Sequence, residues 1–232
     1  MTLSYFITGT DTGVGKTLVS CALLRSLARR HGRAVGMKPV AAGADTAPDG
    51  RLVNEDVSAL RAAGNVVVPA ELDNPYVLAE PVSPHIAARL AGQRIDPALI
   101  EQRYRQLATL ADAVVVEGAG GFCVPLNDTE TSADLAQRLG LPVVLVVGLR
   151  LGCLNHALLT QEAILARGLR LAGWVANRID PAMASAADNL DTLRARLAAP
   201  MLADVPWMAQ PDAAAIDIRL PDPATQAEGG PR

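Results

Sequence analysis

Short apolar segments alternate with segments of helical periodicity along most of this chain. The segments 113–116 and 143–147 are apolar and rich in β-branched residues, which is typical of central parallel strands covered on both faces. Further strands are predicted at 3–8, 34–40, 171–176 and 201–205, and helices at 17–30, 132–139, 154–167 and 184–198. This repetition predicts an α/β fold, with a mostly parallel sheet, right-handed crossovers and helices on both faces.

Proline and glycine mark the ends of two more helices. Ser83-Pro84 and Asp96-Pro97 each place a capping residue before a proline at the first helical position. The first of these helices is expected to stop at Gly92 and the second to run to about Leu110. The Gly/Asp/Pro-rich stretch 41–56 is predicted to be a mobile loop. Ligands of such folds bind outside the carboxyl ends of the strands, so that edge is where we look for chemistry.

Length and composition limit the organisation of the chain. Its 232 residues, 50% of them hydrophobic, suffice for one sizeable core, and we expect a single domain over 1–220 followed by a disordered tail at 221–232. A net charge of −3 leaves no basic surplus for nucleic acid. The apolar run 141–149 is too short to span a bilayer, and no secretion signal begins the chain. Three scattered cysteines form neither a disulfide framework nor a zinc motif. We therefore expect a cytoplasmic protein with no nucleic-acid or membrane partner.

Residues 9–17 read Gly-Thr-Asp-Thr-Gly-Val-Gly-Lys-Thr between a predicted strand and a predicted helix. This is the context of a phosphate-binding loop, in which backbone N–H groups converge on phosphate and the helix N-terminus adds positive potential. Lys16 can reach the β- and γ-phosphates, and the Thr17 hydroxyl can ligate Mg²⁺. The strict pattern has glycine where Thr10 stands, and this chain has it one residue earlier at Gly9. We therefore predict a P-loop NTPase-like fold with a variant loop.

Other candidate residues follow the strands at the same edge. Glu117 ends a buried strand before Gly118-Ala119-Gly120-Gly121, which is the place of an acidic metal ligand. Asp56 precedes a short helix, and its spacing alone favours a helix cap. Only two of the 21 basic residues are lysine, Lys16 and Lys38. Lys38 ends the second strand and suits an anionic ligand that needs a compact ammonium; an ordinary exposed strand-end lysine is the alternative.

Seven motifs occur together in the order that one enzyme family has them. They are the loop at 9–17, Lys-Pro-Val at 38–40, Glu-Pro-x-Ser-Pro-His at 80–85, Glu-Gly-Ala-Gly-Gly at 117–121, Leu-Gly-Cys-Leu-Asn-His at 151–156, Ala-Gly-Trp-Val-Ala-Asn at 172–177 and Val-Pro-Trp at 205–207. On these motifs the chain resembles the dethiobiotin synthetase family. The resemblance implies an ATP- and Mg²⁺-dependent cyclo-ligase of biotin synthesis. It would join 7,8-diaminononanoate to CO₂ through a carbamate and a carbamic–phosphoric anhydride, releasing dethiobiotin, ADP and phosphate.

The resemblance also implies roles for individual residues. Lys16 and Lys38 would be catalytic, and Thr17, Asp56 and Glu117 would hold Mg²⁺. The nucleotide would contact Gly13, Val14, Gly15, Lys16, Thr17, Leu18, Asp56, Glu117, Gly118, Ala119, Gly120, Asn177, Arg178, Pro206, Trp207 and Met208. The diamine would contact Thr12, Lys38, Ala42, Cys153, Leu154 and Asn155, and the helix that begins near Cys153 would receive its carboxylate across a homodimer interface.

Three positions depart from the family pattern. Ala42, Asn189 and Gln210 stand where the family often has serine, tyrosine and glutamate, and the first two changes are expected to weaken substrate binding. The alternative function is a regulatory P-loop ATPase that partitions plasmids or positions septa. Such proteins carry a signature lysine where this chain has Asp11. Another ATP-dependent amidating or carboxylating enzyme of the same fold is a further alternative, but the sequence contains no glutamine-hydrolysing cysteine domain, which argues against it.

Overall fold

The computed structural model describes residues 2–220, so the tail predicted at 221–232 lies outside the described residues. The strands are β1 (Leu3–Gly9), β2 (Ala34–Met37), β3 (Val40–Ala42), β4 (Asp45–Thr46), β5 (Leu52–Val53), β6 (Tyr76–Leu78), β7 (Ala113–Glu117), β8 (Val143–Gly148), β9 (Leu171–Asn177) and β10 (Met201–Val205). The helices are α1 (Lys16–His31), α2 (Glu55–Ala63), α3 (Ala70–Asp73), α4 (Pro84–Leu90), α5 (Pro97–Leu110), α6 (Ser132–Leu139), α7 (Cys153–Ala166), α8 (Ala186–Arg196) and the 3₁₀ turn η1 (Ala213–Ala215).

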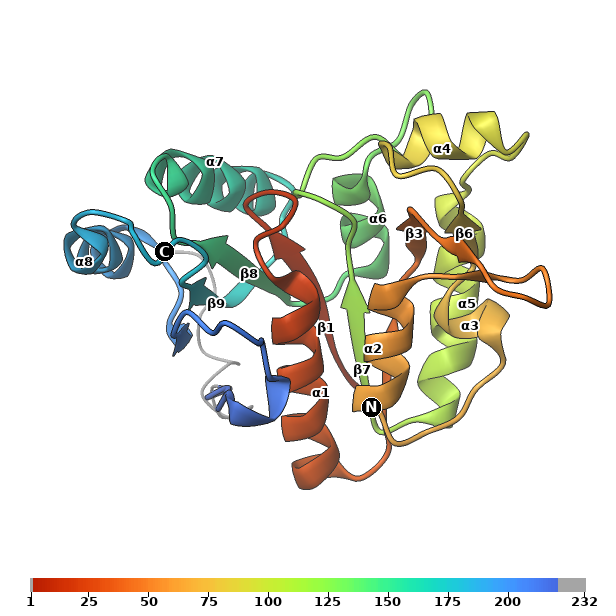
Figure 1. Cartoon of the computed structure of the whole chain (residues 1–232), viewed down its shortest axis with the longest axis horizontal. Coiled ribbons are helices and arrows are strands. Elements are labelled where there is room, and N and C mark those ends of the chain that lie inside the picture. The colour runs from red at the N-terminus through yellow and green to blue at the C-terminus, as the bar shows by residue number, and fades with distance from the viewer. Residues whose placement is uncertain (1, 221–232) are drawn as a thin grey trace.

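Six strands form one parallel sheet in the order β10-β9-β8-β1-β7-β2 (Figure 1). The central strand β1 pairs with β7 from Leu3 opposite Ala113 to Ile7 opposite Glu117. This register places Glu117 at the carboxyl edge of the sheet, next to the end of β1. The predicted parallel α/β fold is therefore confirmed.

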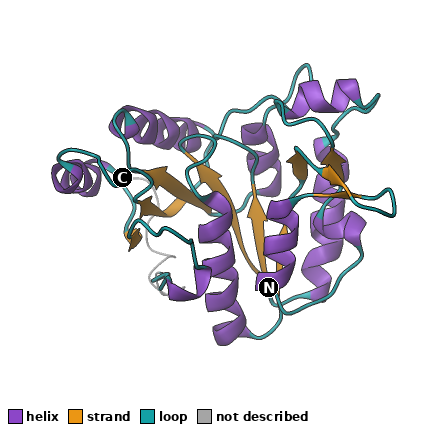
Figure 2. Ribbon diagram, viewed as in Figure 1, coloured by secondary structure: helices purple, strands orange, loops and turns teal. Residues whose placement is uncertain are grey.

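Alternate residues of the strands face two separate parts of the core. Phe6, Val114 and Val116 pack with helices α5 to α8 on one face. Tyr5, Ile7 and Val115 pack with α1, α2 and η1 on the other. Figure 2 shows helices on both sides of the strands. Since both faces are covered, β7 from Ala113 to Val116 and β8 from Val143 to Val147 are apolar without interruption.

Two predictions on the chain after β2 are wrong. The predicted strand 34–40 ends at Met37, and Val40 instead pairs with Tyr76 in a separate two-stranded sheet. The reason is Pro39, which has no N–H group to donate to the sheet. The stretch 41–56, expected to be a loop, contains the antiparallel pair β4–β5 and the start of α2.

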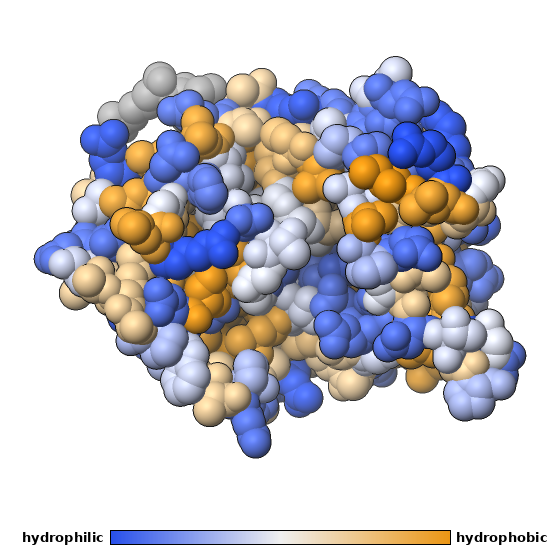
Figure 3. Space-filling model, turned by 45° about the horizontal axis from the view of Figure 1, so that its top comes forward, coloured by the Kyte–Doolittle hydropathy of each residue, from blue (hydrophilic) through white to orange (hydrophobic). Residues whose placement is uncertain are grey.

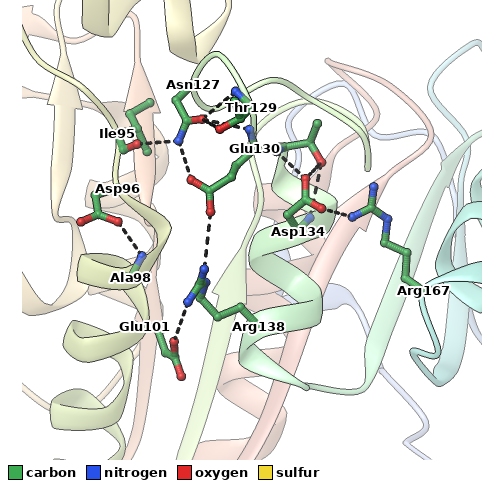
Figure 4. Close-up of polar contacts among 11 residues, drawn as sticks. Ile95, Asp96, Ala98, Glu101, Asn127, Thr129, Glu130, Asp134, Arg138 and Arg167 are labelled. Atoms are coloured by element: carbon green, nitrogen blue, oxygen red, sulfur yellow. Dashed lines mark hydrogen bonds and ion pairs between the residues drawn. The ribbon is translucent and has the colours of Figure 1, made fainter.

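A polar network fixes the connection between β7 and α6, which begins with the glycine-rich turn after Glu117 (Figure 4). Asn127 Nδ2 donates to the carbonyl of Ile95 at 3.0 Å and to Glu130 Oε2 at 2.9 Å. Arg138 on α6 forms ion pairs with Glu130 at 3.5 Å and with Glu101 on α5 at 3.6 Å. The connection is thus tied to two helices.

None of the helices within residues 2–220 is long and apolar enough to cross a bilayer.

Candidate active site

The phosphate-binding loop joins β1 to α1 and depends on glycines. Gly13 and Gly15 have φ of 73° and 86°, in the left-handed region that glycine adopts without strain. A Cβ on Gly15 would lie 2.1 Å from Asn177 Nδ2, and one on Gly9 would lie 2.6 Å from Val14 Cγ2. The close contact with Val14 explains why glycine stands at position 9 of the variant loop.

Two carboxylates, a hydroxyl and an ammonium meet at the carboxyl edge of the sheet. Thr17 Oγ1 lies 2.6 Å from Asp56 Oδ1 and 2.9 Å from Glu117 Oε1. Lys38 Nζ donates to Asp56 Oδ2 at 2.8 Å and to Glu117 Oε1 at 2.6 Å. Lys38 is 5% exposed and Glu117 is fully buried. The interpretation of Lys38 as an exposed strand-end lysine is therefore wrong.

The electrostatics of this cluster favour its charged form. Burial alone would lower the pKa of Lys38, but the charges of Glu117 and Asp56 and the bonds to them outweigh burial and raise it. Burial would raise the pKa of Asp56, but Lys38 and Thr17 lower it. Burial and the neighbouring Lys38 ammonium lower the pKa of Lys16 to about 8. An anionic ligand beside Lys16 would counter both effects.

The cluster offers the oxygen donors that Mg²⁺ takes. Glu117 Oε2 is buried and has no hydrogen-bond partner among the described residues, so one carboxylate oxygen is free to accept a ligand. Mg²⁺ is commonly held by one or two carboxylates together with phosphate oxygens. Within residues 2–220 no group of three or more His, Cys, Asp or Glu could hold a metal. Thr17, Asp56 and Glu117 therefore fit Mg²⁺ if phosphate oxygens complete its shell.

A cavity of about 730 Å³ opens over this cluster. Its floor is polar, with Lys16, Thr17, Lys38, Asp56 and Glu117, and one wall is the Pro81–Pro84 segment before α4. Figure 3 turns this edge of the molecule toward the viewer, and hydrophobic residues gather there on both sides of a paler central strip. The cavity is further lined by Thr12, Gly13, Gly15, Val40, Ala42, Glu55, Ala119, Gly120 and Val124. It combines a charged end with an apolar wall.

A second, smaller pocket of about 180 Å³ gathers several of the residues predicted to contact the nucleotide. It is lined by Leu18, Asn177, Arg178, Ile179, Pro206, Trp207, Met208 and Pro211. Asn177 Nδ2 donates to the carbonyl of Val14 at 2.9 Å, which connects this pocket to the phosphate-binding loop. Arg178 forms two hydrogen bonds of 2.9 Å with Asp204, so its guanidinium supports the pocket wall.

The residues predicted to contact the diamine lie in two places. Thr12, Lys38 and Ala42 line the large cavity. Cys153, Leu154 and Asn155 form the first turn of α7, after the left-handed Gly152, and do not line that cavity in this chain. Of the other departures from the family pattern, Asn189 lies on α8 and bonds to the carbonyl of Ser185. Gln210 is exposed beside the smaller pocket.

The structure corrects the role predicted for one residue and brings further residues to the site. The N-cap of α2 is Asn54, whose Oδ1 accepts from the N–H groups of Asp56 and Val57, so the cap interpretation of Asp56 is wrong. The segment Pro81–Pro84 lines the cavity. It lies within the motif at 80–85, which the sequence analysis identified but to which it assigned no function. Arg150 forms an ion pair with Asp11 of the loop, and no local pattern marks that contact.

Comparison with known proteins agrees with this geometry. The family described as "AAA domain" matches residues 4–215. The ATP-dependent dethiobiotin synthetase BioD of Aromatoleum aromaticum is 57% identical over 221 residues, covering 94% of this chain and 97% of that protein. The enzyme of the same name from Janthinobacterium sp. is 54% identical over 213 residues, covering 90% of each chain.

Solved structures of similar fold are more distant. A ParA family ATPase from Chlorobium tepidum superposes with a TM-score of 0.55 at 12% identity, covering 90% of this chain and 86% of that one. A chain of the MinC:MinD cell division protein complex from Aquifex aeolicus superposes with a TM-score of 0.53 at 16% identity, covering 89% of this chain and 82% of that one. These likenesses establish the P-loop NTPase-like fold and no more. The sequence relatives are close and span nearly the whole chain, and on that ground the chain belongs to the family of ATP-dependent dethiobiotin synthetases.

Proposed function

We propose that this chain forms dethiobiotin from 7,8-diaminononanoate, CO₂ and ATP with the help of Mg²⁺. The observation that carries the proposal is the cluster of Thr17, Lys38, Asp56 and Glu117 on the floor of a cavity beside Lys16. Two ammonium groups and a metal-binding donor set in one cavity suit a reaction between anionic oxygens. The names of the close relatives support the same activity.

The reaction proceeds in three steps. One amine of the diamine attacks CO₂ and loses a proton, which gives a carbamate. A carbamate oxygen attacks the γ-phosphorus of ATP, the bond to the β-phosphate oxygen breaks, and ADP leaves. The second amine then attacks the carbamoyl carbon of the mixed anhydride and gives up one proton to solvent. The C–O bond to the phosphoryl group breaks, and phosphate leaves as the cyclic urea closes.

The residues act mainly by position and charge. The loop Gly13–Leu18 binds the phosphates through its N–H groups, and the pocket at Asn177 and Pro206–Met208 holds adenine. Lys16 and Lys38 stabilise negative charge on the carbamate and on the transferred phosphoryl oxygens. Thr17, Asp56 and Glu117 hold Mg²⁺, which when bound neutralises charge on the phosphates. The apolar wall of the cavity covers the aliphatic chain of the diamine.

The partner surface belongs to the same proposal. Leu151, next to the first turn of α7, is 95% exposed, and Leu159 on the same helix is 56% exposed. Contiguous apolar patches in water mark surfaces that another chain covers, and these two leucines would contribute to such a patch. We infer a homodimer in which this turn, Cys153–Asn155, receives the diamine carboxylate bound mainly in the other subunit. Light scattering at micromolar concentration measures the mass, and a monomer would contradict the inference.

The decisive experiment measures ADP release from Mg-ATP and bicarbonate, with and without the diamine. Release that requires the diamine and matches dethiobiotin formation supports the proposal. Release that ignores the diamine but responds to DNA or lipid would favour a regulatory ATPase instead. Glu117→Gln should raise the Mg²⁺ concentration needed for half-maximal rate, whereas Glu71→Gln, an exposed carboxylate on α3, serves as the matched control.

A further inference from the structure

The backbone of Lys38 is held outside the main sheet. Strand β2 ends at Met37, opposite Val116 of β7. The N–H of Lys38 donates instead to the carbonyl of Asp73 at 2.8 Å, and the N–H of Tyr76 donates to the carbonyl of Pro39 at 3.2 Å. The segment 73–76 therefore replaces a sheet neighbour at the point where the chain carries Lys38.

The side chain of Asn74 completes this contact. Its Nδ2 donates to the carbonyl of Lys38 at 2.7 Å and to the carbonyl of Tyr76 at 3.1 Å. Both protons of one amide group are thus used to hold two chain segments together. An aspartate of the same shape has no proton to donate at neutral pH, so the contact requires the amide.

The same segment also holds the helix that carries Asp56. Arg61, on α2 with Asp56, donates to the two carboxylate oxygens of Asp73 at 2.7 and 2.6 Å. Asp73 is 3% exposed and the Arg61 side chain is 47% exposed, so the two-point pair joins a buried carboxylate to a half-exposed guanidinium. Residues 73 and 74 are therefore a common anchor for Lys38 and for α2.

We propose that Asn74 is a positioning residue for the reaction, because its amide sets the place of Lys38 relative to Asp56 and Glu117. The inference rests on the proposed function, in which Lys38 meets the reacting oxygens. Lys38 Nζ lies 2.8 and 2.6 Å from its two carboxylate partners, and the position of its backbone decides whether the stem reaches both of them and the reacting oxygens without strain. Misplacing a reacting group by about 1 Å can cost on the order of 100-fold in rate.

The test compares Asn74→Ala with a matched variant at the other end of β2. Asn65 accepts from the N–H of Ala34 at 2.8 Å and donates to the carbonyl of Gly32 at 2.8 Å, so Asn65→Ala also removes two side-chain bonds to the backbone. Asn74→Ala should lower kcat for diamine-dependent ADP release by about 10- to 100-fold and leave the Kd for ATP unchanged. Asn65→Ala should leave both unchanged.

Two further variants make the outcome specific. Asn74→Asp keeps the shape of the side chain and should show the same loss of kcat. In a Lys38→Ala background, Asn74→Ala should cause no further loss, since Asn74 acts through Lys38. Wild-type kcat in Asn74→Ala, an equal loss in Asn65→Ala, a further loss in the Lys38→Ala background, or loss of the fold in both Asn74 variants would overturn the proposal. An inactive wild-type protein would instead refute the proposed function.

Discussion

Replacing Lys38 by methionine tests whether its ammonium is the counter-ion of the buried carboxylate. Methionine keeps much of the apolar stem and removes the charge. Lys38 Nζ lies 2.6 Å from Glu117 Oε1 and 2.8 Å from Asp56 Oδ2. At an effective dielectric constant of about 20, each contact corresponds to a gross attraction of roughly 6 kcal/mol.

The net effect is smaller than the gross attraction, because burying the charges has already cost solvation energy. Removing one partner of a buried ion pair typically destabilises a protein by about 3–5 kcal/mol, since the remaining charge stays buried. Glu117 is fully buried, whereas the Asp56 side chain is 33% exposed and water compensates part of its charge. We therefore expect Lys38→Met to lower the free energy of unfolding by about 3 kcal/mol, mostly through Glu117.

Urea denaturation without nucleotide or Mg²⁺ measures this loss. The double variant Lys38→Met with Glu117→Gln should recover much of it, because the unpaired buried charge is gone. Arg51→Met is the matched control, since Arg51 pairs with Asp49 on the surface and such pairs contribute about 1 kcal/mol or less. If Lys38→Met were as stable as wild type, or if the double variant were no more stable than the single one, Lys38 would not be the counter-ion of Glu117.

Four more predictions concern the loop, the thiols, an acidic surface residue and the substrate wall. Gly15→Ala should weaken ATP binding roughly tenfold or more, measured by calorimetry, because it adds left-handed strain and a clash with Asn177; unchanged affinity would contradict the loop geometry. A thiol reagent should titrate only Cys123 in the native protein and all three cysteines in urea, because Cys21 and Cys153 are buried and burial raises the pKa of Cys21 to about 11. Bonds from Arg33 lower the pKa of Asp112 to about 2, so its stabilisation should be complete above the ordinary value of about 4 and fade as the pH falls toward 2. The difference in urea midpoint between wild type and Asp112→Asn should shrink over that range, and a constant difference would count against the pair. Ala42→Ser should lower the KM for the diamine, since Ala42 lines the cavity; an equal or higher KM would show that the missing hydroxyl is compensated elsewhere.

Local signals were enough to predict the elements that build the sheet. The β-branched segments of β7 and β8 and the Asp96-Pro97 start of α5 carry their own structure, because burial on both faces and proline at the first helical turn act over a few residues. The phosphate-binding loop is recognisable for the same reason. Its glycines, Lys16 and Thr17 lie within nine residues.

The contacts that assemble the site depend on residues far apart in the chain. Pro39 signals that β2 must end, but nothing near it indicates that Val40 pairs with Tyr76. The sequence alone favoured Asp56 as the helix cap. Asn54, two residues earlier, has an equally suitable side chain, and the structure shows that Asn54 is the cap. Lys38 was located at the correct edge from its strand, whereas its two carboxylate partners are 18 and 79 residues away.

The shared fold of P-loop ATPases leaves their functions to be decided by individual loop residues. Regulatory ATPases of this fold carry a lysine where this chain has Asp11. Here Asp11 Oδ1 accepts from the N–H of Thr12 at 2.7 Å, and its carboxylate forms an ion pair with Arg150 from the β8–α7 connection. A lysine at position 11 would place a second cation against Arg150 and remove the acceptor for Thr12. Arg150 immediately precedes the exposed Leu151 and the first turn of α7, so this ion pair links the phosphate-binding loop to the surface proposed for the dimer. In this chain position 11 therefore joins the phosphate-binding loop to the connection that leads into α7, and a lysine at this position is incompatible with both contacts.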